Sequence, residues 1–408
     1  MTSAAPDLPP TSVDDVIACV RERVRPLEPE SVALETAAGR VLREPVRAPE
    51  DQPPFDRSAM DGYAVRLDDD ATTFRVVDRI RAGDWKPREL RPGEAVQIAT
   101  GGALPGGGLR VVIKEDTRIE GNRLTVLRRS RERFVRFRGE DARAGQVLVA
   151  PGTRLTPGAL GLLASLGHTR PVTTRLPRVL HLVTGNEIVP PDHAPARGQV
   201  RDSNSLLVRA FLGQWGIVPR QLRVPEDAEA AKSEIRNPKS DSESADLLLI
   251  SGGASVGPHD FSAALLEELG YTLHVRRTTT RPGKPMLFGA RGRALAFGLP
   301  GNPLAHFVCL NLYVRQALEG FSGAAERSGF LPGRLAEAFA TKPNPRETLW
   351  PARLRLAGDG ARLAPLAWRS SGDLTALAVA NALVRIPPRA GALPAGAAVQ
   401  FLATSPDV

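Results

Sequence analysis

The sequence predicts a multidomain α/β protein, and three observations indicate this class. The chain has 408 residues, whereas a single domain usually has about 100–200. From about residue 177, continuous apolar strands alternate with glycine-rich loops and helices, which is typical of a parallel sheet covered on both faces. Residues 45–149 and 327–408 instead contain short β-branched segments separated by turns, which favour two small β domains.

The first domain is expected to be discontinuous, with residues 11–44 and 150–176 on either side of an insertion. Ser12 is a candidate N-cap for a first helix. The apolar residues that follow at helical spacing are Val13, Val16, Ile17, Val20 and Val24. Thr156 and Pro157 suit the cap and the first position of a second helix. A return to helix after a turn-rich stretch is what an inserted domain produces.

The inserted domain, residues 45–149, begins with a proline-rich connector and continues with four strand-like segments, TFRVVDRI, EAVQIAT, LRVVIKED and RLTVL. It also contains an arginine-rich strip, defined here as residues 128–138. Basic residues interleaved with aromatic ones are typical of a nucleic-acid surface. Strand alternation, however, would place the arginines on a solvated face and the apolar residues inside. We favour the second interpretation and expect no nucleic-acid partner.

The α/β domain, residues 177–326, contains three strand–loop–helix units, RVLHLVTGNE, DLLLISGGASVG and ALAFGLPGNPLAHFVCLNLYVRQAL. Ligands of open parallel sheets bind outside the carboxyl ends of the strands, where these loops are expected. Glycines let backbone N–H groups approach an anion, and a following helix N-terminus adds positive potential. Asn302 and Pro303 suit the N-cap and first position of the last helix. We therefore predict an anion or nucleotide pocket that has neither a P-loop nor a dinucleotide fingerprint.

Charged residues accompany these loops. Prolines on both sides of the segment Arg281–Pro285 stiffen it, so that it is either an oxyanion clamp or a solvated basic turn. Carboxylates occur near the turns at Asp61, Asp141, Glu187, Asp202, Asp227 and Asp260. A basic pocket that also holds carboxylates suits a phosphate ester bound with Mg²⁺, although a single Asp in a turn is more often a cap.

Composition excludes several other classes. Cys19 and Cys309 are the two cysteines, and each lies in an apolar helical pattern, so we expect buried small side chains instead of a disulfide framework or a zinc site. His306 is expected to be a packed core residue. Aromatics are only 5%, which disfavours a stacking platform, and the formal charge of +9 favours an anionic partner. Without a signal-peptide pattern or an apolar run near about 20 residues, we expect a cytoplasmic protein that has no membrane partner.

Eight motifs follow one another along the chain. They are Pro54-Phe55-Asp56-Arg57-Ser58-Ala59-Met60-Asp61-Gly62-Tyr63-Ala64-Val65, Ile98-Ala99-Thr100-Gly101, Gly139-Glu140-Asp141, Thr184-Gly185-Asn186-Glu187, Asp202-Ser203-Asn204, Ser251-Gly252-Gly253, Pro282-Gly283-Lys284-Pro285 and Leu299-Pro300-Gly301-Asn302-Pro303. In this order they resemble the molybdopterin molybdenumtransferase family (MoeA; in animals, the E domain of gephyrin). A looser echo of the family follows at Ser371-Gly372-Asp373.

The resemblance implies a homodimer of four-domain subunits. Their domains would be an elongated helical/β domain (11–44 and 150–176), an inserted small β domain, a MogA-like parallel-sheet α/β/α domain that binds molybdopterin, and a C-terminal β-barrel-like domain. The implied enzyme inserts molybdenum into adenylylated molybdopterin, uses molybdate and Mg²⁺, and releases AMP and molybdenum cofactor. A molybdopterin adenylyltransferase and apo-molybdoenzymes are the implied transient partners.

The resemblance also implies site residues. The catalytic positions fall on Asp61, Thr100, Asp141, Glu187, Asp227, Asp260 and Lys284, with Glu187 and Asp260 as candidate Mg²⁺ ligands. The implied substrate-binding residues are Ser251, Gly252, Gly253, Ser255, Gly257, Arg281, Pro300, Gly301, Asn302, Arg353 and Ser371. We expect Lys284 and Arg281 to hold molybdate or phosphate oxygens. Asp61, Thr100 and Asp141 are implied to come from the partner subunit. Fixed charges should matter more than a protein nucleophile.

Four positions depart from the family pattern. Asn186 and Leu109 stand where the family usually has Asp, Arg281 where it has Lys, and Ala305 where it often has Ser. Arg281 keeps the charge but changes its geometry. A second hypothesis is therefore a catalytically weakened, pterin-binding paralogue or scaffold.

Overall fold

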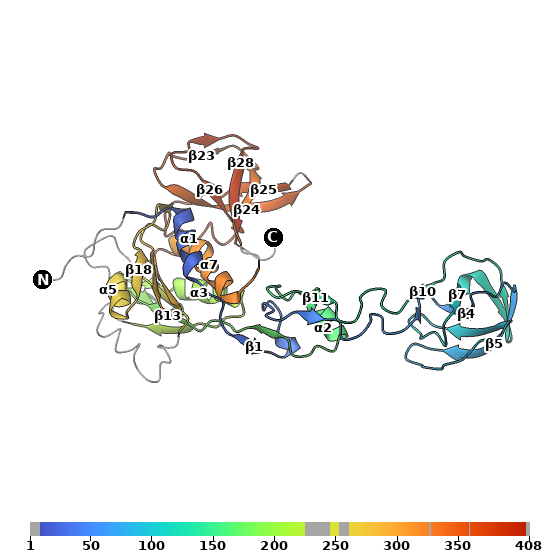
Figure 1. The fold of residues 1–408 in the computed structure, drawn as a ribbon. Coiled ribbons are helices and arrows are strands. Elements are labelled where there is room, and N and C mark those ends of the chain that lie inside the picture. Colours follow the sequence, from blue (N-terminus) through green and yellow to red (C-terminus); the bar gives the residue numbers. More distant parts are fainter. Residues whose placement is uncertain (1–8, 225–244, 253–260, 326–327, 359, 405–408) are drawn as a thin grey trace. The chain divides into compact units, whose positions relative to one another are not determined.

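The computed structural model describes residues 9–224, 245–252, 261–325, 328–358 and 360–404. The chain divides into two compact units. The larger unit comprises Met1–Arg43, Gly152–Thr156 and Arg170–Val408, and the smaller one comprises Glu44–Pro151 and Pro157–Thr169. Figure 1 shows a sheet flanked by helices and a β-barrel in the larger unit, and a second β-rich body in the smaller. The predicted α/β multidomain fold is confirmed.

The main sheet of the larger unit has six strands in the order β16-β13-β17-β21-β20-β18. Their bounds are β13 Val179–Val183, β16 Arg220–Arg223, β17 Leu247–Ser251, β18 Thr272–Val275, β20 Leu287–Arg291 and β21 Ala294–Leu299. The first four strands of this order run parallel, as predicted, but β20 and β18 pair antiparallel at one edge. The reason is the two-residue turn between β20 and β21, which contains Gly292 at φ +57°, because so short a link joins only antiparallel strands.

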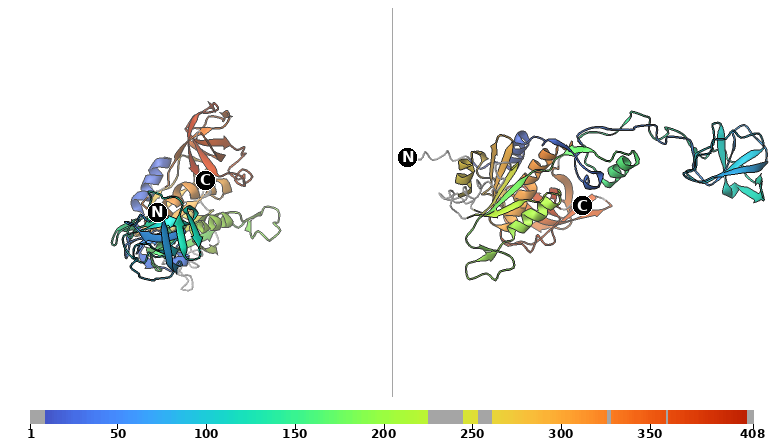
Figure 2. Two further views of the ribbon diagram at one scale, coloured as in Figure 1. Left: turned by 90° about the vertical axis from the view of Figure 1, so that its right-hand side faces the viewer. Right: turned by 90° about the horizontal axis from the view of Figure 1, so that it is seen from below.

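Both faces of this sheet are apolar and covered by helices (Figures 1 and 2). These helices are α1 Val13–Arg23, α3 Asn204–Gly213, α5 Phe261–Glu268, α6 Pro303–Cys309 and α7 Arg315–Ser322. Alternate residues of β17 enter opposite cores: Leu247 and Leu249 pack with α1, α3, α6 and α7, while Leu248 and Ile250 pack with α5. Such two-sided burial explains the uninterrupted apolar pattern of the strand.

Helix α1 begins as predicted. The Ser12 Oγ accepts a hydrogen bond from the Asp15 backbone N–H at 3.2 Å, which satisfies one of the free donors of the first turn. Val13, Val16 and Val20 are fully buried. The helix packs closely on α7, since a Cβ at Gly320 would lie 2.1 Å from Cγ1 of Val24.

Five strands close a β-barrel at the C-terminal end of the larger unit. They are β22 Leu331–Leu335, β24 Glu347–Ala357, β25 Gly360–Pro365, β26 Ala382–Ile386 and β28 Ala398–Ala403. The ring β24-β25-β22-β28-β26 is completed by the β24–β26 pairing, which confirms the predicted barrel. A short strand, β19 (Thr280–Arg281), joins β24 in parallel, with Arg281 opposite Thr348. The basic loop, defined here as residues 281–285, is thereby fixed to the barrel at its first residue.

The smaller unit contains a six-stranded sheet in the order β7-β4-β6-β5-β9-β8. The bounds are β4 Gly62–Arg66, β5 Thr73–Ile80, β6 Glu94–Ile98, β7 Leu109–Ile113, β8 Thr117–Glu120 and β9 Arg123–Val126. The four predicted segments therefore contain strands. Helix α2 (Pro157–Ser165) begins at the predicted proline.

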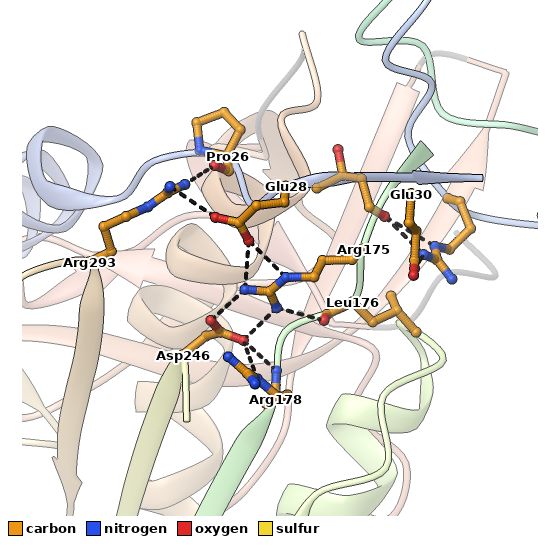
Figure 3. A network of polar contacts seen from close by, with 10 residues as sticks. Pro26, Glu28, Glu30, Arg175, Leu176, Arg178, Asp246 and Arg293 are labelled. Atoms are coloured by element: carbon orange, nitrogen blue, oxygen red, sulfur yellow. Dashed lines mark hydrogen bonds and ion pairs between the residues drawn. The ribbon is translucent and has the colours of Figure 1, made fainter. Parts of the chain in front are cut away.

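Ionic contacts hold together the amino ends of three parallel strands (Figure 3). Asp246, which directly precedes β17, accepts two hydrogen bonds from the Arg175 guanidinium, at 2.7 and 2.8 Å. It also accepts the backbone N–H of Arg178, which precedes β13, at 2.7 Å. Glu28 pairs with Arg175 and with Arg293, which precedes β21. The network lies at the edge of the sheet opposite to the candidate site, so its role is to align the strands.

The structure corrects the predicted burial of Cys19 and the strand predicted for the arginine-rich strip. Both cysteines are free, and Cys309 is buried as predicted, but Cys19 is only partly buried. The arginine-rich strip is not a strand, since only Val135–Arg136 of it adopts strand geometry (β10). No helix within the described ranges is long and apolar enough to cross a bilayer.

Candidate functional site

The carboxyl ends of the parallel strands β13, β17 and β21 are tied together by hydrogen bonds. The backbone N–H and the Oγ1 of Thr184 donate to the Ser251 carbonyl at 3.0 and 3.1 Å. The Gly252 N–H donates to the Leu299 carbonyl at 3.3 Å. These bonds place three of the predicted loops side by side at one edge of the sheet, where ligands of such sheets bind.

Gly252 is needed for this close approach. Its φ is +89°, and a Cβ there would lie 2.8 Å from Oγ1 of Thr184. A side chain would therefore strain the backbone and push the two strand ends apart. The glycine that the sequence places after β17 thus serves tight packing of the loops.

The loop after β21 is held from three directions. Asn204 Nδ2 donates to the Gly301 carbonyl at 2.7 Å, and the Leu304 N–H donates to the Ser371 carbonyl at 3.0 Å. The His306 ring bonds the Pro300 carbonyl through Nδ1 at 3.1 Å. Asn302 and Pro303 occupy the predicted N-cap and first position of α6, but the Asn302 side chain makes no capping bond. Gly301 and Asn302 are exposed to solvent at this edge of the sheet.

The basic loop brings an arginine against an aromatic ring. The guanidinium carbon of Arg281 lies 5.3 Å from the ring centroid of Trp368, and the Nη1 of the neighbouring Arg346 donates to the Thr280 carbonyl at 3.4 Å. Burial and the charge of Arg281 lower the pKa of Arg346. The loop itself rests on the core, where a Cβ at Gly283 would lie 3.1 Å from Sγ of Cys309.

The basic side chains of this region have no ion-pair partner among the described acids. Among the described residues, none of Arg281, Lys284 and Arg346 forms an ion pair. The adjacent acid on β24, Glu347, is instead paired with Arg385, which also contacts Asp14 at 2.7 Å. The described acids therefore leave this positive charge unneutralised, as an anion-binding site requires.

The barrel contributes a turn to this cluster but not Arg353. Ser371 lies in the turn whose Gly372 would bring a Cβ to 3.7 Å from Oδ1 of Asn302. Arg353 is exposed on β24, five residues beyond Thr348, which is about 16 Å along a strand. The structure thus brings Ser371 to the loop after β21 and keeps Arg353 away from Arg281.

Of the two candidate Mg²⁺ ligands, Glu187 lies within the described residues and Asp260 lies outside them. Glu187 is exposed in the turn after β13, next to the exposed Asn186. Within the described ranges, no group of three acidic, histidine or cysteine side chains could hold a metal ion. Mg²⁺ commonly takes one or two carboxylates and completes its shell with water and substrate phosphates, so a single carboxylate beside the strand-end loops fits that chemistry. Other predicted residues lie outside the described part, namely Asp227, Gly253, Ser255, Gly257 and Asp260.

Two predicted residues of the smaller unit form a hydrogen-bonded pair. Asp61 Oδ1 accepts the backbone N–H and the Oγ1–H of Thr100, both at 2.7 Å. The two bonds lower the pKa of Asp61 below its ordinary value. Both side chains are exposed, so this is an oriented, ionised carboxylate open to a ligand.

Asp141 lies in a neighbouring turn of the same unit. Its backbone N–H bonds the Gln52 carbonyl at 2.8 Å, and its carboxylate pairs with Arg136. Arg136 also contacts Glu140 at 3.3 Å. The structure therefore presents Asp141 as a paired acid, which a cationic or hydrogen-bonding ligand group would have to share with Arg136.

The arginine-rich strip is largely occupied by internal partners. Arg128 pairs with Asp116 at 2.9 Å, Arg129 with Asp70 at 2.7 Å, and Arg138 with Asp51 at 2.9 Å. Arg133 lies over the Phe137 ring at 6.0 Å. Pairing of this kind lowers the unneutralised charge of the strip, the charge on which binding to nucleic-acid phosphates depends.

The structure also locates residues that depart from the family pattern or were not predicted. Leu109 is buried in the core of the smaller unit with Val111, and Ala305 is buried in α6. Sequence reasoning missed Arg346 and Trp368. They lie at least 65 positions from Arg281 in the chain. Arg346 directly precedes β24 and Trp368 follows β25, and the β19–β24 pairing brings these segments to the basic loop.

Comparison with known families matches three models to this chain. Residues 11–167 match the MoeA N-terminal region (domains I and II), residues 181–320 a probable molybdopterin binding domain, and residues 332–404 the MoeA C-terminal region (domain IV). A molybdopterin molybdenumtransferase of Bacillus subtilis is 33% identical over 408 residues, 96% of this chain and 94% of the relative. One from Staphylococcus epidermidis is 29% identical, covering 97% and 96%.

Solved structures agree with these matches. A crystal structure of a molybdopterin biosynthesis MoeA protein from Pyrococcus horikoshii has a TM-score of 0.79 and 28% identity. It covers 97% of this chain and 100% of its own. The similarity therefore extends over both compact units.

Proposed function

Since the chain belongs to the molybdopterin molybdenumtransferase family, a family of transferases of molybdenum cofactor biosynthesis, we propose that it inserts molybdenum from molybdate into adenylylated molybdopterin and releases AMP. The observation that carries this proposal is the set of basic residues Arg281, Lys284 and Arg346, which form no ion pair with the described residues, together with the three joined strand-end loops. Such an arrangement suits two anions, a phosphate group and an oxyanion, held close together.

In this proposal each part of the site has a distinct task. The loop that begins at Gly252 and the N-terminus of α6 hold phosphate through backbone N–H groups. Lys284 and Arg281 hold molybdate oxygens, and the loop of Pro300, Gly301 and Asn302 lines the pocket. Ser371 approaches from the barrel turn. The reaction then depends on orientation and fixed charge, with no protein nucleophile.

Mg²⁺ is part of the proposal, with Glu187 as the described ligand and Asp260 as a second candidate from the sequence. Bound there, the ion would neutralise phosphate charge as AMP leaves. Glu187 itself would hold the ion at the end of β13, where its exposed carboxylate faces solvent. Arg353, Asp227, Gly253, Ser255 and Gly257 remain candidates from the resemblance.

We further propose a homodimer in which one subunit supplies Asp61, Thr100 and Asp141 to the site of the other. The exposed, ionised Asp61 supports this, because an oriented carboxylate at a surface is suited to a donor group of a ligand. Cytoplasmic location and transient contact with a molybdopterin adenylyltransferase and with apo-molybdoenzymes belong to the same proposal.

Turnover of the defined substrates tests the proposal. The purified protein is incubated with adenylylated molybdopterin, molybdate and Mg²⁺, and AMP release and reconstitution of an apo-molybdoenzyme are measured. We expect both signals, and omission of molybdate should abolish the reconstitution. Tight pterin binding without AMP release would contradict the proposal and favour the second hypothesis, a catalytically weakened paralogue or scaffold suggested by Asn186, Leu109 and Ala305.

A further inference from the structure

A chain of hydrogen bonds crosses the sheet of the larger unit beneath the strand-end loops. It runs from Arg209 through Gln221 and His181 to Ser251. His181 and Ser251 are almost fully buried, at 0% and 3% exposure. The chain therefore links a surface arginine on α3 with the last residue of β17, which lies at the predicted pocket edge.

The orientation of the Gln221 amide is fixed by two independent partners. Its Oε1 accepts from Arg209 Nη2 at 2.6 Å, which only an oxygen can do. Its Nε2 donates to the Ser205 carbonyl at 2.9 Å. The second N–H of the same amide nitrogen points to Nδ1 of His181 at 2.9 Å. Gln221 thus acts as a donor toward the histidine.

This arrangement settles which His181 nitrogen carries the proton. Burial, reinforced by the neighbouring His306, lowers the pKa of His181 to about 3, so the ring is neutral and has one N–H. Because Nδ1 accepts from Gln221, the proton must lie on Nε2. That N–H points to Oγ of Ser251, 2.5 Å away. The serine oxygen is consequently an acceptor within the protein.

The Ser251 O–H is left to donate elsewhere. Within the ranges that the structure describes, Oγ makes no bond other than that to His181. The Ser251 carbonyl is already used by Thr184. We propose that His181, oriented by Gln221, is a positioning residue that presents the Ser251 hydroxyl as a hydrogen-bond donor to an anionic oxygen of the substrate. This inference rests on the proposed function for the identity of that substrate.

The same polarity gives Ser251 a role opposite to that of a nucleophilic serine. A catalytic serine donates its proton to a histidine that acts as base. Here the histidine donates to the serine, so no base is available on the ring and no acyl or phosphoryl serine intermediate is formed. The Ser251 hydroxyl instead adds a fixed dipole beside the loop that begins at Gly252, whose own N–H is already used by the Leu299 carbonyl.

The protonation pattern can be measured without any turnover. Long-range ¹H–¹⁵N spectra of the full-length protein, labelled at histidine, report which ring nitrogen carries the proton, and His181→Gln assigns the signal. We expect the proton on Nε2 in the wild type. The isosteric Gln221→Glu replaces the donor by an acceptor, so the proton should move to Nδ1. A wild-type Nδ1–H form would overturn the inference even if the proposed transferase activity is fully confirmed.

Kinetics with adenylylated molybdopterin then test the role in function. We expect Ser251→Ala and His181→Leu each to lower kcat/KM about tenfold or more, as for loss of a hydrogen bond to a charged group. The double variant should lose no more than either single one. His181→Gln, whose amide N–H can replace the Nε2–H donor, should recover part of the loss.

A matched control separates this role from simple packing. His274→Leu changes a half-buried histidine on β18, outside the relay, and should leave kcat/KM unchanged. If Ser251 directs its O–H inward, toward the unpartnered Nε2 of His306, then Ser251→Ala will lower the melting temperature and leave kcat and KM intact. That result would refute the positioning role while leaving the proposed function untouched.

Discussion

The guanidinium carbon of Arg281 lies 5.3 Å from the ring centroid of Trp368. The first residue belongs to the short strand β19 and the second to the turn region after β25, so the contact fixes the basic loop against the barrel. A cation over an indole face is stabilised by about 0.5–2 kcal/mol, depending on burial. The ring therefore sets where the charge of Arg281 points.

Trp368→Leu should make the Arg281 guanidinium more mobile without removing its charge. We expect the KM for molybdate to rise about 3- to 10-fold, which corresponds to loss of the cation–π stabilisation, with a smaller effect on kcat. The measurement is AMP release at varied molybdate concentration. Trp215→Leu is the matched control, because Arg154 lies over that ring at 5.0 Å in a different part of the larger unit. An equal rise of KM in both variants would contradict the assignment.

Lys284→Ala tests the proposed anion clamp directly. The side chain is partly exposed and has no ion-pair partner within the described ranges, so the fold should survive and the melting temperature should stay nearly unchanged. Activity should fall by about a hundredfold or more, as expected when a charge that stabilises the reacting groups is removed. Lys342→Ala, at an exposed position of the barrel, should retain full turnover. Unchanged activity of Lys284→Ala would count against the clamp.

The strand-end loops could be predicted because their signals are local. An apolar strand followed by glycine, as at Ser251–Gly252, indicates a tight turn at the carboxyl edge of a parallel sheet. The same local logic identified Ser12 as the cap of α1, and the bond from the Asp15 N–H confirms it. At these positions a few neighbouring residues determine the local structure.

The partners of the basic loop could not be predicted from local patterns. Trp368 and Arg346 reach Arg281 only because β19 pairs with β24 across the boundary between sheet and barrel. The strand predicted for the arginine-rich strip is wrong for a related reason. Its ion-pair partners, such as Asp51 and Asp116, come from distant segments and hold it in turns and loops.

Thr100→Val should raise the pKa of Asp61 toward its ordinary value. The variant keeps the backbone N–H but removes one of the two bonds that stabilise the ionised carboxylate. A carboxylate with a lowered pKa stays charged to more acidic pH, so Asp61 should remain ionised at lower pH in the wild type than in the variant. Carbon-detected NMR titration of the labelled carboxyl measures this. Overlapping titration curves would show that the Thr100 hydroxyl has no influence.

Activity should follow the same direction if Asp61 must be ionised. In Thr100→Val the acidic limb of the pH–rate profile should move to higher pH, whereas activity near neutral pH should fall only modestly because the carboxylate is charged in both proteins. Thr117→Val is a suitable control, since that hydroxyl donates to the Lys114 carbonyl in the same unit and does not contact Asp61. A shift of the acidic limb in Thr117→Val but not in Thr100→Val would contradict the assignment.

Asp246→Asn should destabilise the larger unit, because Asp246 joins the amino ends of the strands through Arg175 and Arg178 (Figure 3). Burial raises the pKa of Asp246, but the hydrogen bonds from Arg175 and Arg178 outweigh it and leave the pKa lowered. The side chain is only 11% exposed, and we expect the free energy of unfolding in urea to fall by about 2 kcal/mol.

The contribution of Asp246 should depend on pH. Because its pKa is lower in the folded than in the unfolded protein, it stabilises the fold above the unfolded-state pKa, near 3.9, and this stabilisation disappears as pH falls through the folded-state pKa. The gap between wild type and variant should therefore stay constant from about pH 5 to 8 and narrow below about pH 4. Asp68→Asn, at an exposed pair with Arg66, should change stability little throughout, and a gap that widened toward acid would contradict this account.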